Sequence, residues 1–325
     1  MSETPLIETR HLKKFFSTPK GLLHAVDDIS LSIFPGQTLG VVGESGCGKS
    51  TLGRVMIRLL PATGGEVLYR GENFLAYNGR RMKEMRKKVQ IIFQDPYASL
   101  NPRMTVSEII AEPLKVCRIC PDKESMQKKI RELMDTVGLA PRLANTYPHE
   151  LDGGRRQRIG IARALAVSPE FIVCDEPVSA LDVSIQAQIL NLLMDLQDSY
   201  KIAYLFITHD LSVVRHISDE IMVMYLGQCV EKAPSQELFR NPAHPYTEAL
   251  LSAIPIPSVR PEDKMKNVIR GELSSPINPK PGCRFAARCP YATSACTQQA
   301  IPLTEIAPNH MVACTKYQDK GEHHG

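Results

Sequence analysis

A glycine-rich run near the start of the chain has the residue types and spacing of a phosphate-binding loop. Residues 43–50 read Gly-Glu-Ser-Gly-Cys-Gly-Lys-Ser and fit G-x-x-x-x-G-K-[ST] at every fixed position. The glycines would let consecutive backbone N–H groups point at phosphate oxygens. Lys49 would lie against the β- and γ-phosphates, and the Ser50 hydroxyl would ligate Mg²⁺. The run therefore predicts a magnesium–nucleotide site formed by these residues: Gly43, Glu44, Ser45, Gly46, Cys47, Gly48, Lys49, Ser50 and Thr51.

A pair of acids after an apolar run would complete the chemistry of such a site. Residues 171–174 are Phe-Ile-Val-Cys, and Asp175 and Glu176 follow them. Asp175 would hold Mg²⁺ through water, while Glu176 would orient or deprotonate the attacking water. His209 follows the next apolar run and would lie beside the γ-phosphate. An apolar run followed by two acids is by itself a weak signal. Together with the phosphate loop, these residues indicate hydrolysis of a nucleoside triphosphate.

These side chains require parallel strands whose carboxyl ends meet at one edge of a sheet. Short apolar runs predict strands at 38–42, 171–174 and 203–207. Apolar spacing predicts a helix at 51–60, ending at Pro61, and another at 184–197. This alternation over residues 1–253 is typical of a mostly parallel α/β sheet, with a helix-rich insertion at 103–147. Beyond Ile254, frequent prolines exclude long regular elements.

Length and charge narrow the class of protein. A chain of 325 residues predicts one large α/β domain with an appendage, or two domains. The net charge of +4 is too small to indicate nucleic-acid binding, and the basic cluster at 80–88 is interpreted as a solvated helix face. No run of 18 apolar residues occurs, and the charged first 16 residues do not resemble a secretory signal. We therefore expect a cytoplasmic protein.

The order of the motifs resembles that of an ABC-type ATPase. After the phosphate loop come Phe-Gln-Asp-Pro at 93–96, Leu-Asp-Gly-Gly-Arg-Arg-Gln-Arg at 151–158, Asp-Glu-Pro at 175–177, Ser-Ala-Leu-Asp at 179–182, and His209. Further segments resemble the ATPase subunits of oligopeptide/dipeptide importers: Asn-Pro-Arg at 101–103, Pro-Val-Ser-Ala-Leu-Asp-Val-Ser at 177–184, His-Pro-Tyr-Thr at 244–247 and Gly-Cys at 282–283.

The resemblance implies an α/β fold of the P-loop NTPase class, ABC type. The ATP-binding domain would occupy residues 1–254, with an inserted helical subdomain at about 95–165. Residues 255–325 would form a small proline- and cysteine-rich C-terminal extension of the oligopeptide/dipeptide-transporter type. ATP and Mg²⁺ are the implied cofactors.

The same resemblance implies an ATP hydrolase that energises import of peptides, or related small solutes, through a membrane permease. Its partners would be a second ATPase subunit, two transmembrane permease subunits and, indirectly, an external solute-binding protein, with no nucleic acid. The chain would then lie peripherally on the cytoplasmic face of the cell membrane. The alternatives are a soluble ABC-type ATPase acting on a macromolecule, a small-molecule kinase, and a metal-sensing or interaction module.

Several residue roles follow from the resemblance alone. Gln94 would be a ligand of Mg²⁺ and water that also senses the permease, and segment 94–113 would contact a coupling helix of that permease. Asp182 would bridge to the opposite ATPase subunit. Phe16, or alternatively Phe15, would stack on adenine because stacking needs only an aromatic face.

The signature segment departs from the usual Leu-Ser-Gly-Gly-Gln. Asp152 replaces serine and Arg155 replaces glutamine, while Gly153 and Gly154 are retained. An ionised aspartate would bring like charge towards the γ-phosphate, and two unit charges about 4 Å apart interact by roughly 4 kcal/mol at an intermediate dielectric. Arg155 would offset this charge by pairing with Asp152 or by reaching the phosphate itself. The altered signature favours pairing with a paralogous subunit.

Four cysteines gather in the extension with the spacing C-x5-C-x6-C-x17-C: Cys283, Cys289, Cys296 and Cys314. Four thiolates suit Zn²⁺ or an iron–sulfur cluster, and four unligated thiols in a small core are the structural alternative. The absence of short C-x₂₋₄-C pairs argues against zinc. The family resemblance favours a structural [4Fe–4S] cluster, whose charge Arg284 and Arg288 would partly neutralise.

Overall fold

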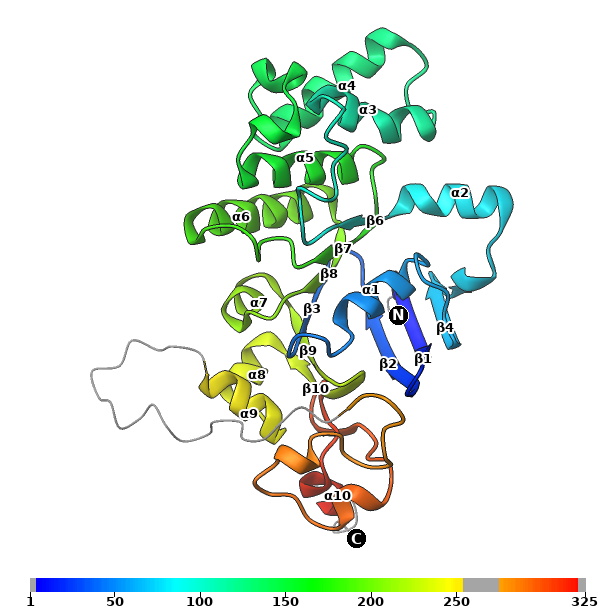
Figure 1. Cartoon of the computed structure of the whole chain (residues 1–325), viewed down its shortest axis with the longest axis vertical. Helices are drawn as coiled ribbons and strands as arrows, with labels where there is room; N and C mark the ends of the chain where they lie inside the picture. Colours follow the sequence, from blue (N-terminus) through cyan, green and yellow to red (C-terminus); the bar gives the residue numbers. More distant parts are fainter. Residues whose placement is uncertain (1–3, 254–274, 321–325) are drawn as a thin grey trace, which may run out of the picture. The chain divides into compact units, whose positions relative to one another are not determined.

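The computed structural model describes residues 4–253 and 275–320, with side chains to residue 318 (Figure 1). These residues fall into two compact units. Among the described residues, the first contains residues 4–7, 33–37 and 69–207, and the second contains residues 8–32, 38–68, 208–253 and 275–320. The predicted start of the extension, at 255–274, lies outside the described residues.

The first unit contains a short parallel sheet and a helical segment. Strand β7 pairs in parallel with β6 on one side and β8 on the other, and all five β7 side chains are buried. Helices α3, α4 and α5 pack together, which confirms the helical insertion (Figure 1). The elements are β5 Glu72–Asn73, η1 Phe74–Ala76, α2 Gly79–Lys88, β6 Val89–Ile92, α3 Val106–Val116, α4 Lys123–Thr136, η2 Pro141–Asn145, η3 Pro148–Glu150, α5 Gly153–Leu165, β7 Phe171–Asp175, α6 Val183–Tyr200 and β8 Ala203–Ile207.

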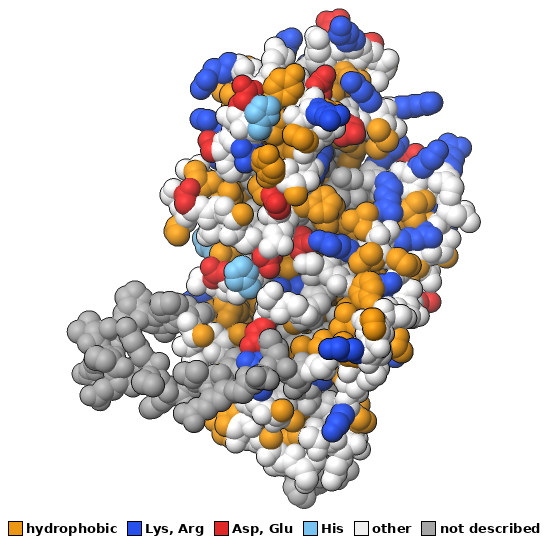
Figure 2. Space-filling model, in the orientation of Figure 1, with side chains coloured by type: hydrophobic (Ala, Val, Ile, Leu, Met, Phe, Trp, Pro, Cys, Tyr) orange, Lys and Arg blue, Asp and Glu red, His pale blue; other side chains and the backbone are white. Residues whose placement is uncertain are grey.

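Local sequence sets the start of several of these helices. Thr105 and Glu108 form a capping box at α3, in which Thr105 Oγ1 accepts from Glu108 N and Glu108 Oε2 accepts from Thr105 N. Asp152 and Asp182 are the N-caps of α5 and α6. The basic cluster at 80–88 lies on α2, where Arg80, Arg81 and Lys83 are exposed and the three basic residues at 86–88 are half-buried; Lys and Arg side chains are drawn blue in Figure 2.

The second unit is built on a mixed sheet and a smaller sheet. Strand β3 pairs in parallel with β9, which pairs antiparallel with β10. Strands β2, β1 and β4 lie side by side in that order. The elements are β1 Ile7–Thr18, β2 Gly21–Ile33, β3 Thr38–Val42, α1 Lys49–Met56, β4 Gly64–Tyr69, α7 Leu211–Ile217, β9 Glu220–Tyr225, β10 Gln228–Pro234, α8 Ser235–Arg240, α9 Pro245–Ser252, η5 Ala286–Arg288, α10 Ala295–Gln298, β11 Thr304–Ala307, β12 His310–Val312 and η6 Thr315–Lys320.

The C-terminal extension continues the mixed sheet. Strand β12 pairs antiparallel with β10, with Glu231 opposite Val312, and β11 pairs with β12. Phe285 of the extension lies in the same apolar cluster as Tyr225 and Tyr246. Short elements agree with the proline content, whereas the two strands were not predicted.

No helix within 4–253 or 275–320 is both long and apolar enough to cross a membrane.

Candidate nucleotide site

The phosphate loop lies between β3 and α1 in a conformation that glycine permits. Gly43 and Gly48 have φ values of 152° and 104°. A Cβ at Gly43 would lie 2.2 Å from Met224 O, and one at Gly48 would lie 1.9 Å from Ala25 O. Both the backbone angles and the close neighbours therefore require glycine at these two positions.

Lys49 is the first residue of α1, and its buried side chain turns back into the loop. Its Nζ donates to Gly43 O at 2.8 Å and to Glu44 O at 3.0 Å. Cys47 is also buried, and burial raises the pKa of its thiol, so the neutral form is favoured. The loop thus places a cation at the amino end of a helix, where the helix dipole also favours an anion.

His209 and the two candidate adenine-stacking residues belong to the same unit as the loop. Thr208 N donates to Val41 O at 3.2 Å, which places the exposed His209 next to the end of β3. Phe15 stacks on His24 with ring centroids 3.9 Å apart. The Lys14 ammonium lies 4.7 Å from the Phe16 centroid. Both phenylalanine rings are half-buried.

The predicted catalytic carboxylates lie in the first unit, at the end of β7. Asp175 is fully buried, and Glu176 follows it with φ of 48°, which is unusual for a residue with a side chain. Gln94 Nε2 donates to Glu176 Oε2 at 2.9 Å. The structure therefore brings together two residues that are 82 positions apart and holds one of them in a strained backbone conformation of the kind common at functional sites.

The altered signature forms an ion pair of its own. Asp152 Oδ1 accepts from Arg155 N at 2.8 Å, while Asp152 Oδ2 lies 3.2 Å from Arg155 Nη1. Aspartate caps a helix as well as serine does, so the replacement preserves the start of α5. Both side chains are exposed, so the ion pair contributes little to stability, although it does offset the aspartate charge locally.

The two signature glycines allow α5 to approach α6. A Cβ at Gly153 would lie 3.0 Å from Leu181 Cδ2, and one at Gly154 would lie 2.6 Å from Ile185 Cγ2. Asp182, between these two neighbours, accepts from Ile185 N at 3.0 Å and from Ser184 Oγ at 2.8 Å. The Ile185 N–H lowers the pKa of Asp182, with Ser184 contributing, so Asp182 is ionised at neutral pH.

The four cysteines of the extension share one small region. Cys283 N donates to Cys296 O at 2.7 Å, and Cys296 Sγ lies 3.3 Å from Thr315 Oγ1, next to Cys314. Burial, with smaller contributions from Cys289, Cys296 and Cys314, raises the pKa of Cys283 to about 11. Among residues 4–253 and 275–320, no three His, Cys, Asp or Glu residues are placed to hold a metal ion.

Two contacts of the phosphate loop were not predicted from the sequence. Glu44 N donates to Tyr246 Oη at 2.8 Å, and the Glu44 carboxylate pairs with Arg288 of the extension. The His-Pro-Tyr-Thr motif at 244–247 contains Tyr246, but from the sequence this motif indicated only a family resemblance. Arg284, which like Arg288 was expected to neutralise a cluster, pairs with Asp27.

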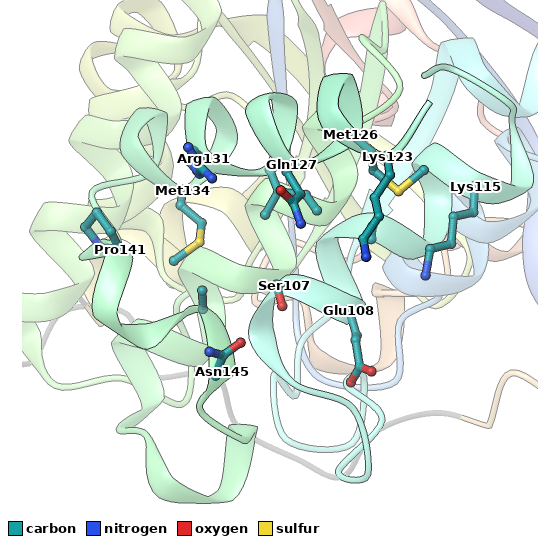
Figure 3. Close-up of a pocket in the computed structure, with 13 residues that line it drawn as sticks. Ser107, Glu108, Lys115, Lys123, Met126, Gln127, Arg131, Met134, Pro141 and Asn145 are labelled. Carbon is teal, nitrogen blue, oxygen red and sulfur yellow. The ribbon is translucent and has the colours of Figure 1, made fainter. Parts of the chain in front are cut away.

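A cavity of about 750 Å³ lies in the helical segment, between α3, α4 and η2 (Figure 3). Its apolar lining includes Met126, Ile130 and Met134, and the charged groups at its rim include Lys115 and Lys123.

The family model described as "ABC transporter" matches residues 26–179, and the model described as "Oligopeptide/dipeptide transporter, C-terminal region" matches residues 230–296. The chain is 52% identical over 321 residues to the putative oligopeptide transport ATP-binding protein YkfD of Bacillus subtilis (strain 168), covering 98% of each chain. It is 51% identical over 305 residues to the oligopeptide transport ATP-binding protein OppF of Salmonella typhimurium, covering 94% of this chain and 91% of that one.

A solved structure agrees with these sequence matches. The dimeric, post-hydrolysis structure of the ATP-binding cassette MJ0796 bound to ADP and Pi superimposes with a TM-score of 0.65 at 28% identity. The match covers 70% of this chain and 98% of that chain.

Proposed function

We infer the function from a premise that these matches establish: the chain belongs to the family of oligopeptide transport ATP-binding proteins, the ATPase subunits of ABC importers. We propose that it hydrolyses ATP to energise import of peptides, or related small solutes, through a membrane permease, bound peripherally at the cytoplasmic face. The observation that carries this proposal is a glycine-dependent phosphate loop with a buried lysine at the start of a helix, in a chain that also has the peptide-transporter extension. The alternative, a soluble ATPase acting on a macromolecule, receives no support.

Each nucleotide-site residue receives a specific role in this proposal. Gly43 to Thr51 would bind the phosphates, with Lys49 neutralising their charge and Ser50, Gln94 and Asp175 holding Mg²⁺. Glu176 would orient or deprotonate the attacking water, and His209 would contact the γ-phosphate. The hydrogen bond from Gln94 to Glu176 supports these roles because it fixes the carboxylate in one orientation.

The signature and Asp182 would act on a second ATPase subunit. Asp152, Gly153, Gly154 and Arg155 would complete the partner's ATP site, and Asp182 would bridge to it. The ion pair between Asp152 and Arg155 supports this role, because Arg155 offsets the negative charge that Asp152 brings to the signature. We propose a paralogous partner, because two chains with different signatures would give two unlike sites.

The permease would dock on segment 94–113 and the adjoining cavity of the helical segment. Ser107, Glu108 and Ala111 of that segment line the cavity (Figure 3). An apolar lining with lysines at the rim suits an amphipathic helix that carries acidic residues. Glu108, which is exposed, is the one acidic residue among those lining the cavity.

We propose three finer features. The boundary between the ATP-binding domain and the extension would fall at residues 254–255. Phe16, or Phe15, would stack on adenine. A [4Fe–4S] cluster, or Zn²⁺ in its place, would be held by the four cysteines of the extension, and no step of the proposed mechanism involves either. Anaerobically purified protein should be brown with iron and sulfide near four per chain if the cluster exists. Colourless protein with freely titrating thiols would contradict the proposal of a cluster.

The proposed function is tested by combining nucleotide binding with membrane association. Full-length protein should bind Mg²⁺-ATP, and Lys49→Ala should weaken that binding while the protein stays folded. After cell fractionation, the chain should follow the membrane only when its permease is present. Binding without any permease-dependent membrane fraction would instead favour the soluble alternative.

A further inference from the structure

The C-terminal extension contacts the phosphate loop at Glu44. Arg288, at the end of η5, presents both Nη atoms to the Glu44 carboxylate: Nη1 is 2.8 Å from Oε2, and Nη2 is 3.1 Å from Oε1. Nη1 also donates to Tyr225 Oη at 3.2 Å. The Arg288 side chain is 9% exposed and that of Glu44 is 23% exposed. A bidentate pair this sheltered fixes the orientation of both side chains.

A second contact holds the backbone of the same loop residue. Glu44 N donates to the Oη of Tyr246, a fully buried residue at the start of α9. His244 caps this helix by accepting from Tyr246 N at 3.1 Å. Burial raises the pKa of Tyr246, so its phenol stays protonated. We call Glu44, Tyr225, Tyr246 and Arg288 the Glu44 clamp.

The extension itself is anchored so that Arg288 points at the loop. Phe285 is 1% exposed and packs against Tyr225 and Tyr246, with each pair of centroids 5.3 Å apart. Arg288 N donates to Phe285 O at 2.9 Å, which continues the anchored turn. Arg284 donates to Leu226 O and to the Asp27 carboxylate. Gly227, which follows Leu226 in the chain, donates its N–H to Cys47 O of the loop at 2.8 Å. The segment 284–288 therefore contacts or supports the loop at two points.

The charges of Glu44 and Arg288 connect their ion pair to nucleotide binding. Glu44 places a carboxylate in the loop that binds a triphosphate, and like charges at short range repel strongly in a partly buried site. Arg288 neutralises that carboxylate and restrains the loop. We propose that Arg288 is a positioning residue for nucleotide binding, so that the ATP affinity of this phosphate loop depends on the C-terminal extension. This proposal rests on the proposed function only in assuming that the loop binds ATP.

The test measures Mg²⁺-ATP affinity of the full-length chain by calorimetry. Arg288→Met removes the charge at similar length and should weaken binding about tenfold, the factor that corresponds to about 1.4 kcal/mol. Arg288→Lys keeps the charge but loses the bidentate geometry, so an intermediate loss of about threefold is expected. Lys316→Met is the matched control, because it makes the same charge change at an exposed residue of the extension and should leave affinity unchanged.

Glu44→Gln separates a positioning role from a merely structural one. This variant breaks the same ion pair but removes the like charge and leaves the cation, so its affinity should rise rather than fall. The double variant Glu44→Gln/Arg288→Met should recover most of the loss caused by Arg288→Met. Equal losses in Glu44→Gln and Arg288→Met, or wild-type affinity in folded Arg288→Met, would overturn the proposal. Failure of the wild-type chain to bind ATP would instead contradict the proposed function.

Discussion

Adding one methyl group at Gly154 should weaken the packing of α5, while the same addition at Gly160 should strengthen the helix. A Cβ at Gly154 would lie 2.6 Å from Ile185 Cγ2 and 3.8 Å from Ile185 Cβ. A β-branched side chain in a helix has few rotamers into which it can move. Overpacking lowers the free energy of unfolding by about 1–3 kcal/mol. Because Ile185 is only half-buried and can shift towards solvent, we expect a loss in the lower part of that range.

Gly160 provides the matched control in the same helix. It lies in the interior of α5, and no described atom outside the helix backbone is within 4 Å of a Cβ built there. Alanine is better than glycine by about 1 kcal/mol in a helix interior. Part of that gain also applies at Gly154, the second residue of α5, and offsets some of the clash. We therefore expect Gly160→Ala to stabilise the protein by about 1 kcal/mol and Gly154→Ala to destabilise it by about 1 kcal/mol.

Urea unfolding of the nucleotide-free chain measures this difference. The two midpoints should move in opposite directions with an unchanged slope, which identifies a change in stability rather than in compactness. Adding Ile185→Leu to Gly154→Ala removes the clashing Cγ2 and should recover part of the loss. A Gly154→Ala protein as stable as Gly160→Ala would refute the packing of α5 on α6 described here.

Three further predictions concern pH, the extension and the signature. Burial lowers the pKa of His244 to about 4 from 6.5, so the unfolded chain binds more protons between these values, and stability should fall by about 3 kcal/mol as pH drops from 7 to 4. His244→Asn keeps an N-cap acceptor and should reduce the loss of stability between pH 7 and 4, measured by unfolding at several pH values. An unchanged pH dependence would show that His244 is not its source. His310→Ala leaves the fully buried Glu231 carboxylate without the ring nitrogen 2.7 Å away, and should cost about 3 kcal/mol and speed hydrogen exchange in β12; unchanged exchange would argue that β12 is held otherwise. Asp152→Ser with Arg155→Gln should raise ATP hydrolysis by the assembled transporter if the altered signature impairs the partner's site, and unchanged or lower activity would mean that the ion pair is a functional substitute.

Short apolar runs predicted three of the buried strands, β3, β7 and β8, and no others. The predicted strands at 38–42 and 203–207 match β3 and β8, because five consecutive buried side chains leave little choice of conformation. The helix expected at 51–60 instead occupies Lys49–Met56. Arg58 adopts φ of 55°, and the N–H groups of Leu59 and Leu60 turn back to Arg54 O. No glycine or proline marks that ending at Met56, so local sequence did not reveal it.

Long-range contacts were beyond sequence reasoning. Strands β11 and β12 are short, and their place depends on β10, with Val312 opposite Glu231. Arg284 and Arg288 lie beside cysteines in the sequence, which suggested cluster neutralisation. Their carboxylate partners, Asp27 and Glu44, are 257 and 244 positions away. Only the fold brings these residues together, whereas the phosphate loop could be recognised from consecutive residues.

The central claim is that this chain hydrolyses ATP at its own site, with Glu176 acting on the attacking water. The most direct measurement is steady-state ATP hydrolysis by the assembled transporter carrying Glu176→Gln, together with ATP binding by the same variant. The amide preserves the shape of the side chain but cannot accept the proton, so binding should be retained and turnover lost. Near-normal turnover by the variant would contradict the claim and show that this chain's site is not the working one.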